Sequence, residues 1–188
     1  GTNDDSATLE KSYNTGDVSG NSYVGGVCGL NGGNGTVNGC YNTGTVRGSY
    51  SGSVCGSNYS TVQNCYYLGG TNSKAFGSGT GANCKSKNNL QFQNGDVAFC
   101  LQNDLGQNAE PVWGQRIGTD KTPVLSSETD YKVYHPTSGT SPCTGGYNNT
   151  GDGTLAHKYE NSACIYCGEP EPPKDVEGYY QIINQWQL

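Results

Sequence analysis

Residues 13–40 read YNTGDVSGNSYVGGVCGLNGGNGTVNGC, and residues 41–65, which follow directly, read YNTGTVRGSYSGSVCGSNYSTVQNC. The two segments share residues at matched positions, and a third unit begins at Tyr66. A period of roughly 20–50 residues indicates a solenoid, a propeller or another repeat array. The matched pairs are Tyr13/Tyr41, Gly16/Gly44, Val18/Val46, Gly20/Gly48, Gly25/Gly52, Val27/Val54, Cys28/Cys55, Asn31/Asn58, Val37/Val62 and Cys40/Cys65.

Each unit contains three short strand-like runs, centred on Val18, Val27 and Val37 in the first unit and bounded by glycine or asparagine. Helical spacing of apolar residues does not occur here, so three strands per unit favour one turn of a parallel β-helix. Because neighbouring strands lie about 4.8 Å apart, equivalent side chains would form ladders along the stack. The valine and cysteine positions are predicted to be the inward ladders. Val37 and Cys40 can both point inward only if the chain bends at residues 38–39.

Composition favours short strands over a thick globular core. Hydrophobic residues make up 32% of the chain and charged residues 14%, whereas glycine occurs 30 times. The net charge of −6 disfavours nucleic acid and anionic membrane surfaces. Since the sequence also contains no basic patch and no membrane span, we expect neither a nucleic-acid partner nor direct membrane insertion. The lack of methionine favours an internal or processed fragment of a longer parent protein.

Three stretches carry a resemblance to a known family: VGGVCGLNGG (24–33), GCYNTGTVRG (39–48) and VQNCYYLGG (62–70). They resemble the GLUG motif family of bacterial surface proteins, which is common in gut anaerobes. The resemblance implies a secreted or cell-wall-attached protein, often adhesin-like. It implies neither a catalytic residue nor a defined ligand.

The predicted fold class is mainly β. We expect a short parallel β-solenoid (β-helix) of GLUG coils with a small α/β cap, followed by a small zinc-knuckle-like module. Solenoids need such a cap over their last apolar coil. The expected domains are residues 1–70 for the GLUG-repeat solenoid, 71–135 for the capping segment with a short helix, 136–170 for the Cys/His module, and 171–188 for a linker and the start of a following module.

The capping segment has three expected parts. Residues 71–90 are polar and glycine-rich and are expected to be irregular. Residues 90–101 begin a helical pattern, with Asp96 as its N-cap or first-turn acid. Residues 131–135 read as a strand. The aromatic residues expected to pack over the last coil, with an aromatic ligand platform as the alternative, are Trp113, Phe92 and Phe99.

The chain has nine cysteines, an odd number for a closed set of disulfides. Stacked coils would bring Cys28 next to Cys55 and Cys40 next to Cys65, within reach of a disulfide. The alternative is a stack of reduced, buried thiols, which we favour because ladder side chains run parallel to one another. The cysteines whose pairing stays open are Cys28, Cys40, Cys55, Cys65, Cys84 and Cys100, of which the last two could close one loop.

A candidate zinc site follows Pro136, where the composition changes. Cys164 and Cys167 form a C-x-x-C-G motif that would bind one ion through two thiolates. His157 and Cys143 would complete a tetrahedral set. Because four protein ligands leave no position for water, the zinc would be structural. The alternatives are a disulfide among these cysteines or free thiols.

We expect chelation of this zinc to unfold residues 140–170 and to leave the repeats folded. The segment has few apolar residues, so the metal would supply much of its folding free energy. Circular dichroism before and after addition of a chelator, together with metal analysis of the purified chain, checks this prediction. A zinc content far below one ion per chain would contradict it.

Three functions follow from these features. The first is a non-catalytic binding module for a secreted host protein or a glycan, such as an immunoglobulin or a mucin, because Tyr, Ser, Gly and Asn make adaptable recognition surfaces. The second is a structural spacer, with neighbouring domains of the parent chain as its partners. The third, a carbohydrate-active β-helix enzyme, requires two carboxylates across a cleft. The sequence identifies no partner for Glu110, Asp120 or His135 in such a site.

Overall fold

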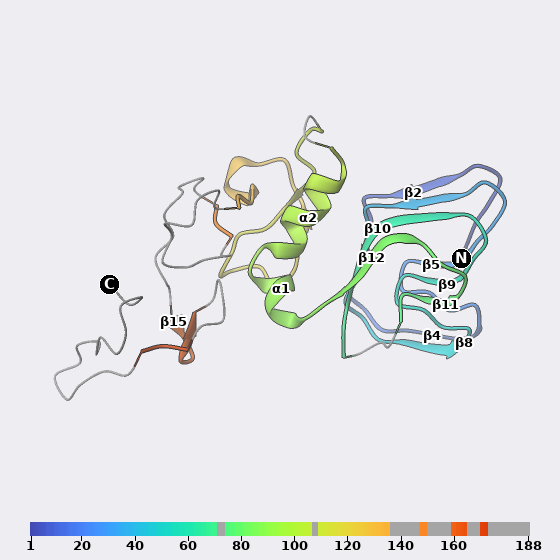
Figure 1. Cartoon of the computed structure of the whole chain (residues 1–188), viewed down its shortest axis with the longest axis horizontal. Helices are drawn as coiled ribbons and strands as arrows, with labels where there is room; N and C mark the ends of the chain where they lie inside the picture. Colours follow the sequence, from blue (N-terminus) through green and yellow to red (C-terminus); the bar gives the residue numbers. More distant parts are fainter. Residues whose placement is uncertain (71–73, 107–108, 136–146, 150–158, 165–169, 173–188) are drawn as a thin grey trace.

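The computed structural model describes residues 1–70, 74–106, 109–135, 147–149, 159–164 and 170–172. This part of the chain is mainly β-structure, with short helices beside the strands (Figure 1). The strands are β1 (Thr2–Asn3), β2 (Thr8–Glu10), β3 (Tyr13–Asn14), β4 (Val18–Ser22), β5 (Cys28–Asn31), β6 (Thr36–Asn38), β7 (Tyr41–Asn42), β8 (Val46–Ser49), β9 (Cys55–Asn58), β10 (Thr61–Leu68), β11 (Phe76–Ser78), β12 (Ala82–Lys87), β13 (Trp113–Gly114), β14 (Val124–Leu125), β15 (Tyr159–Glu160) and β16 (Ala163–Cys164). The helices are α1 (Asn89–Gln93), α2 (Asp96–Asp104) and a 3-10 turn at Thr129–Tyr131.

Strands β1 to β12 form parallel sheets that Figure 1 shows from one end of the stack. One sheet has the order β1-β5-β9-β11, and a second has the order β2-β6-β10-β7-β3 with β12 also paired to β10. A third sheet contains β4 and β8. Figure 1 places β5, β9 and β11 between β4/β8 on one side and β2, β10 and β12 on the other. Successive coils therefore lie side by side in register, which is consistent with a β-helix-like fold.

One corner of each coil is turned by a residue with left-handed backbone. Val37 and Cys40 lie on either side of such a corner, and both have 0% of their surface exposed. The bend expected at residues 38–39 is therefore present, and it turns both side chains inward despite their odd spacing. Glycine and asparagine adopt this conformation at the lowest cost. The corner residues are Lys11 (φ 48°), Gly39 (φ 62°), Asn64 (φ 54°) and Asn83 (φ 50°).

Valine and cysteine fill the space between the two larger sheets, as the ladder pattern predicts. The partners in register that lie in this buried cluster include Val37/Val62 and Cys28/Cys55. The inward position expected for Val18 is wrong. Val18 and Val46 are partners on β4 and β8 but are only half-buried, because they begin a two-stranded layer whose remaining residues are exposed.

Asparagine side chains form further ladders along the stack. The side chain of Asn31 is completely buried, and its Nδ2 donates to Oδ1 of Asn58 at 2.8 Å. Its own Oδ1 accepts a hydrogen bond from Nδ2 of Asn3, also at 2.8 Å. Asn14 and Asn42 make the same 2.8 Å contact elsewhere in the coil. Because these amides are paired, their burial adds bonds between coils without leaving unsatisfied polar groups.

A third coil lies where the sequence predicts irregular structure. Strand β11 pairs with β9, so that Phe76 lies opposite Cys55. Strand β12 pairs with β10, so that Cys84 lies opposite Cys65. The expectation for residues 71–90 is therefore wrong over β11 and β12. These strands depend on the edge that the preceding coil offers rather than on a local apolar pattern.

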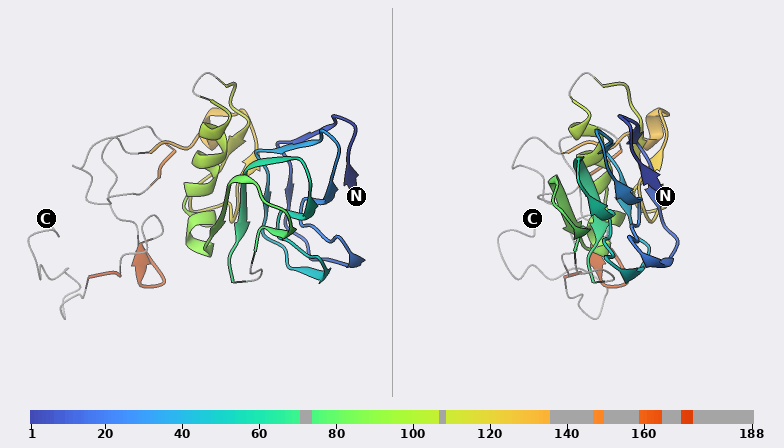
Figure 2. Two further views of the ribbon diagram at one scale, coloured as in Figure 1. Left: turned by 45° about the vertical axis from the view of Figure 1, so that its right-hand side comes forward. Right: turned by 90° about the vertical axis from the view of Figure 1, so that its right-hand side faces the viewer.

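Helices α1 and α2 lie beside the stack of coils (Figures 1 and 2). A capping box starts α1: Oδ1 of Asn88 accepts from the backbone N–H of Gln91, and Oε1 of Gln91 accepts from that of Asn88. Asp96 is the first-turn acid of α2, as predicted, and Gly95 is the N-cap. A buried cluster joins the helices to the stack and contains Tyr41, Tyr66, Phe92, Val97, Leu101 and Trp113.

The aromatic residues expected to cover the coils have different environments. Phe92 and Trp113 are each 2% exposed, and each ring lies 5.6 Å from that of Tyr41. The packing interpretation is confirmed for both. Phe99 packs instead against His135 at 5.5 Å and Tyr147 at 5.3 Å.

The strand expected at residues 131–135 is not formed. Tyr131 ends the 3-10 turn, and the guanidinium of Arg116 lies 4.7 Å from the centre of its ring. Tyr134 makes only an isolated antiparallel bridge to Asn148. The segment stays out of a sheet because no partner strand lies beside it in the described residues. Those residues also contain no helix with the length and apolar character needed to cross a bilayer.

Candidate functional site

Two exposed tyrosines stack on one another where β4 and β8 end. The rings of Tyr23 and Tyr50 have centres 5.6 Å apart and planes 30° apart. Tyr23 is 43% exposed and Tyr50 is 59% exposed. We call these residues the tyrosine pair. Large amphipathic rings held at a surface are typical of recognition sites, since each offers apolar area and a hydroxyl group.

The backbone of both members of the tyrosine pair is left-handed. The φ angle is 50° at Tyr23 and 48° at Tyr50. A bulky residue in this region costs of order 1–3 kcal/mol and persists only where the surroundings hold it. Such strained residues cluster at functional sites. The strain occurs in two consecutive coils and places both rings in the same position, so it is a repeated feature of the fold.

A ladder of glycines holds the loops that carry the tyrosine pair. At Gly56, a Cβ would lie 2.4 Å from the carbonyl carbon of Tyr23 and 2.6 Å from the backbone nitrogen of Val24. At Gly77, a Cβ would lie 2.2 Å from the carbonyl oxygen of Tyr50. Each loop therefore lies directly on the strand of the next coil, and only glycine leaves room for it.

Small polar residues surround the tyrosine pair on β4 and β8. Ser22 and Ser49 precede the two tyrosines and are exposed partners in register. Further along this layer, Arg47 and Asp17 form an exposed ion pair at 3.9 Å. The backbone N–H of Thr45 donates to Asp17 at 2.8 Å, and this hydrogen bond lowers the pKa of the Asp17 carboxyl group. Apart from Arg47, the residues of β4 and β8 are uncharged.

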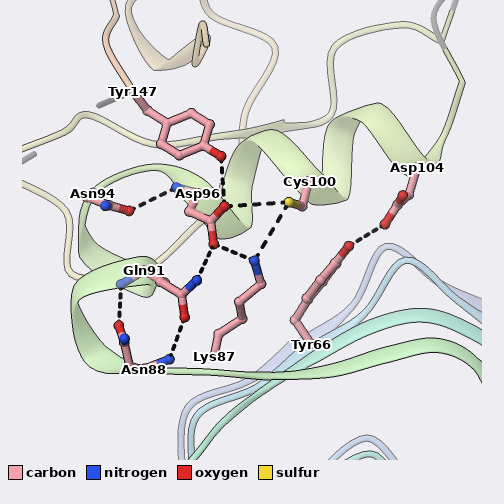
Figure 3. A network of polar contacts seen from close by, with 9 residues as sticks. All are labelled: Tyr66, Lys87, Asn88, Gln91, Asn94, Asp96, Cys100, Asp104 and Tyr147. Carbon is pink, nitrogen blue, oxygen red and sulfur yellow. Dashed lines mark hydrogen bonds and ion pairs between the residues drawn. The ribbon is translucent and has the colours of Figure 1, made fainter. Parts of the chain in front are cut away.

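A buried polar network ties the helices to the last coil (Figure 3). Nζ of Lys87, at the end of β12, contacts Oδ2 of Asp96, and both side chains are 12% exposed. Gln91 Nε2 donates to the same oxygen at 3.1 Å, and the hydroxyl of Tyr147 donates to Oδ1 at 2.8 Å. Burial, together with this bond, raises the pKa of Tyr147. Donors contact both oxygens of the Asp96 carboxylate. This arrangement suits a structural role, holding the helices to the last coil, rather than proton transfer.

The second contact in Figure 3 joins Tyr66 to α2. The Tyr66 hydroxyl donates to Oδ2 of Asp104 at 2.6 Å. Nδ2 of Asn83 donates to the same oxygen at 3.1 Å. Burial, followed by this hydrogen bond, raises the pKa of Tyr66. Asn83 also donates to Asn64 at 2.9 Å, which donates to Asn38 at 3.0 Å. Asp104 thus ends a third asparagine ladder.

The carboxylates nearest Trp113 in the sequence do not face a common cleft. Glu110 lines a hollow with Asp104, next to the corner of the coils. Asp120 lines a different hollow with Leu90, and it accepts a hydrogen bond from the backbone N–H of Arg116 at 2.7 Å. His135 is exposed, and its ring lies 5.1 Å from that of Tyr147.

Of the four predicted zinc ligands, Cys143, His157 and Cys167 lie outside the described residues. Cys164 is described, as a buried residue on β16 opposite Tyr159. Within the described residues no group of three or more His, Cys, Asp or Glu side chains is arranged to hold a metal ion. The zinc site therefore stays a prediction.

The structure places no disulfide between the cysteines of the repeats, which agrees with the favoured interpretation. Cys28, Cys55, Cys40 and Cys65 are free and buried. The alternative of a disulfide between Cys84 and Cys100 is wrong, because both are free thiols. Cys84 lies in register with Cys65, whereas the sulfur of Cys100 lies 3.7 Å from Oδ1 of Asp96.

The tyrosine pair is the feature that sequence reasoning missed. Its signal is the dipeptide Ser-Tyr at residues 22–23 and again at residues 49–50. Aligning the two units on Gly20 and Gly48 leaves these tyrosines unmatched, because β4 is one residue longer than β8 and the register shifts between Ser19 and Ser22. Aligning them on Gly25 and Gly52 matches Tyr23 with Tyr50. The structure shows that the two rings occupy equivalent places and stack on one another.

Comparison with known proteins bears on this same region. The family model of the GLUG motif matches residues 20–47, which run from β4 into β8 and include Tyr23. No curated protein and no solved structure matches the chain. The chain therefore carries a GLUG motif, and the match supports a GLUG-repeat protein.

Proposed function

We propose that the chain is a non-catalytic binding module of a bacterial surface or secreted protein, adhesin-like in character, and that the tyrosine pair contacts its partner. The partner is a secreted host protein or a glycan, of which an immunoglobulin and a mucin are examples. The module acts outside the cell or attached to the cell wall. Its repeats form a short β-solenoid that also contacts neighbouring domains of the parent chain.

The observation that carries this proposal is the strained, stacked and exposed geometry of Tyr23 and Tyr50. A tyrosine side chain has few rotatable bonds, so fixing it before binding lowers the entropy that association must overcome. Tyrosine is also enriched among the residues that contribute most to binding. The serine and glycine residues beside the pair supply hydrogen bonds without large charges, which suits a protein or glycan surface.

The test is a binding measurement with a double substitution, Tyr23→Asn with Tyr50→Asn. Asparagine tolerates left-handed backbone, so the variant is expected to be at least as stable as the original chain. Binding to the captured partner is expected to weaken at least ~10-fold, because exposed ring area is lost. Affinity capture from mucosal secretions identifies the partner, and surface plasmon resonance with the purified partner measures the dissociation constant.

Tyr59→Asn is the matched control, because Tyr59 is 71% exposed but lies outside the tyrosine pair. This control should bind like the original chain. Equal binding by the double variant would exclude the tyrosine pair as the contact surface. If the original chain captures no saturable partner, the function is that of a structural spacer. In that case an unrelated spacer of equal length should preserve the activity of the parent protein.

The zinc module forms a second part of the proposal. We propose that Cys143, His157, Cys164 and Cys167 hold a structural zinc ion, on the strength of their spacing and of the few apolar residues around them. The metal would fold the segment after the cap. Unfolding of this segment by a chelator, with the repeats left folded, tests this part independently of the tyrosine pair.

A further inference from the structure

Two ladders of cysteine run through the interior of the coils. In the first, Cys28 and Cys55 are Cα partners on β5 and β9. In the second, Cys65 and Cys84 are Cα partners on β10 and β12. Cys40 extends the second ladder, because the next residue, Tyr41, is the partner of Tyr66. Four of these cysteines are buried, and Cys84 is partly exposed at the last coil.

The side chains within each ladder have the same orientation. Sγ of Cys28 and of Cys55 each contacts the carbonyl oxygen two residues later, at 3.1 and 3.0 Å. In the other ladder each Sγ contacts the carbonyl oxygen two residues earlier: Cys40 at 3.3 Å, Cys65 at 3.1 Å and Cys84 at 3.4 Å. Because the orientation repeats, neighbouring sulfurs are separated by about the distance between strands, roughly 4.8 Å.

This sulfur–sulfur separation suits a metal ion with two ligands in a straight line better than it suits a disulfide or a tetrahedral zinc site. A disulfide needs sulfurs about 2.05 Å apart, so the ladder would have to distort to form one. A tetrahedral zinc ion needs four ligands that converge at about 2.3 Å, whereas these sulfurs lie in a line. The midpoint between two neighbouring sulfurs lies roughly 2.4 Å from each, close to the length of a metal–thiolate bond. A cation that accepts two ligands in a straight line therefore fits without a pre-formed cavity.

We propose that the cysteine ladders bind soft monovalent metal cations of the Cu(I) or Ag(I) class, each held linearly between two stacked sulfurs. Thiolate ligands select such cations over hard ones. Binding of one cation between Cys28 and Cys55 releases two protons and leaves a bis-thiolate with one negative charge. In the other ladder a cation lies on each side of Cys65, whose sulfur bridges the two. Three protons leave, and the net charge is again one negative. No oxidation or reduction occurs.

Each thiol of a ladder loses its proton when it binds the cation. Thiolate is the form that binds metal. Cys84 is the least buried of the set and gives the cation access to its ladder from solvent.

The experiment is an anaerobic titration of the reduced full chain with Cu(I), buffered by a chromophoric Cu(I) chelator, and separately with Ag(I). Cys65→Ala is expected to remove both cations of its ladder, and Cys28→Ala one cation. Cys100→Ala is the control and should remove none, because Cys100 lies outside both ladders. These are differences between variants, so metal bound by the Cys/His module does not alter them.

X-ray absorption of the loaded original chain gives a second readout, which stays informative if a variant fails to fold. Two sulfur neighbours per ladder cation in a linear arrangement support the proposal. Retention of the original stoichiometry by Cys65→Ala would overturn it, as would three or more sulfurs around each ion. Uptake that requires a denaturant would also overturn it, because the folded ladder would then not be the site.

Discussion

Gly56→Ala is expected to lower the free energy of unfolding by about 3 kcal/mol or more, the upper part of the range for overpacked cores. The new Cβ would meet the backbone of Tyr23, Gly29 and Val24 at 2.4 to 2.6 Å, and real Cβ atoms do not approach backbone that closely. Because the obstacles are backbone atoms rather than flexible side chains, relief requires the strands or the loop to move. Urea denaturation followed by circular dichroism measures the change.

Gly16→Ala is the matched control for this prediction. A Cβ at Gly16 would have only Oδ1 of Asn14 within reach, at 3.7 Å, which is ordinary contact. We expect a change within about 0.5 kcal/mol, as for other surface substitutions. Equal urea midpoints for the two variants would show that the loop of the tyrosine pair does not rest on the glycine ladder. Gly56→Ala should also weaken partner binding, because the loop carrying Tyr23 would be displaced.

Asp96→Ala is expected to destabilise the chain by about 3–5 kcal/mol, the range for breaking one side of a buried ion pair. The substitution leaves the ammonium of Lys87 in a site that is 12% exposed and removes the acceptor of Tyr147 and Gln91. It also removes the first-turn acid of α2. Chemical denaturation monitored by tryptophan fluorescence is a suitable measurement, since Trp113 lies in the cluster between helices and coils.

Two further variants separate the loss of the ion pair between Lys87 and Asp96 from the loss of the other contacts that Asp96 makes. Asp17→Ala removes a carboxylate whose pair with Arg47 is exposed, so the loss of this ion pair should change the free energy of unfolding far less than Asp96→Ala does. Lys87→Met combined with Asp96→Leu removes both charges and should recover much of the loss, because no charge then stays buried. A double variant as unstable as Asp96→Ala would instead assign the loss to Tyr147, Gln91 and the helix start.

The sequence predicts the stacked part of the structure well because one alignment fixes many contacts. Matching Cys28 with Cys55 and Val37 with Val62 gives the register of the parallel strands, and the structure has the same partners. The odd spacing of Val37 and Cys40 predicts the bend that Gly39 makes. The spacing of Val97, Cys100 and Leu101 likewise predicts one shared helix face, on which Val97 and Leu101 are buried and Cys100 is partly buried.

The features that escaped prediction depend on a surface made by other parts of the chain. Strand β12 has little apolar pattern of its own and forms because β10 offers an open edge beside it. The tyrosine pair depends on a backbone conformation that tyrosine rarely adopts, and its cause lies in Gly56 and Gly77 on the following coils. Such long-range causes leave no local signal in the residues that they act on.

The asparagine ladders show why the resistance of the stack to stretching differs between the direction along its axis and the direction across it. In the first ladder each side-chain amide points its N–H toward the next coil, as Asn3 does to Asn31 and Asn31 to Asn58. In the ladder of Asn38, Asn64 and Asn83 the N–H groups point toward the preceding coil. A pull across the stack is carried by the covalent backbone of every coil at once. A pull along the stack is carried by hydrogen bonds and side-chain packing between coils, which load one junction after another. The array is therefore stiff when stretched sideways, and along its axis it yields by peeling away single coils.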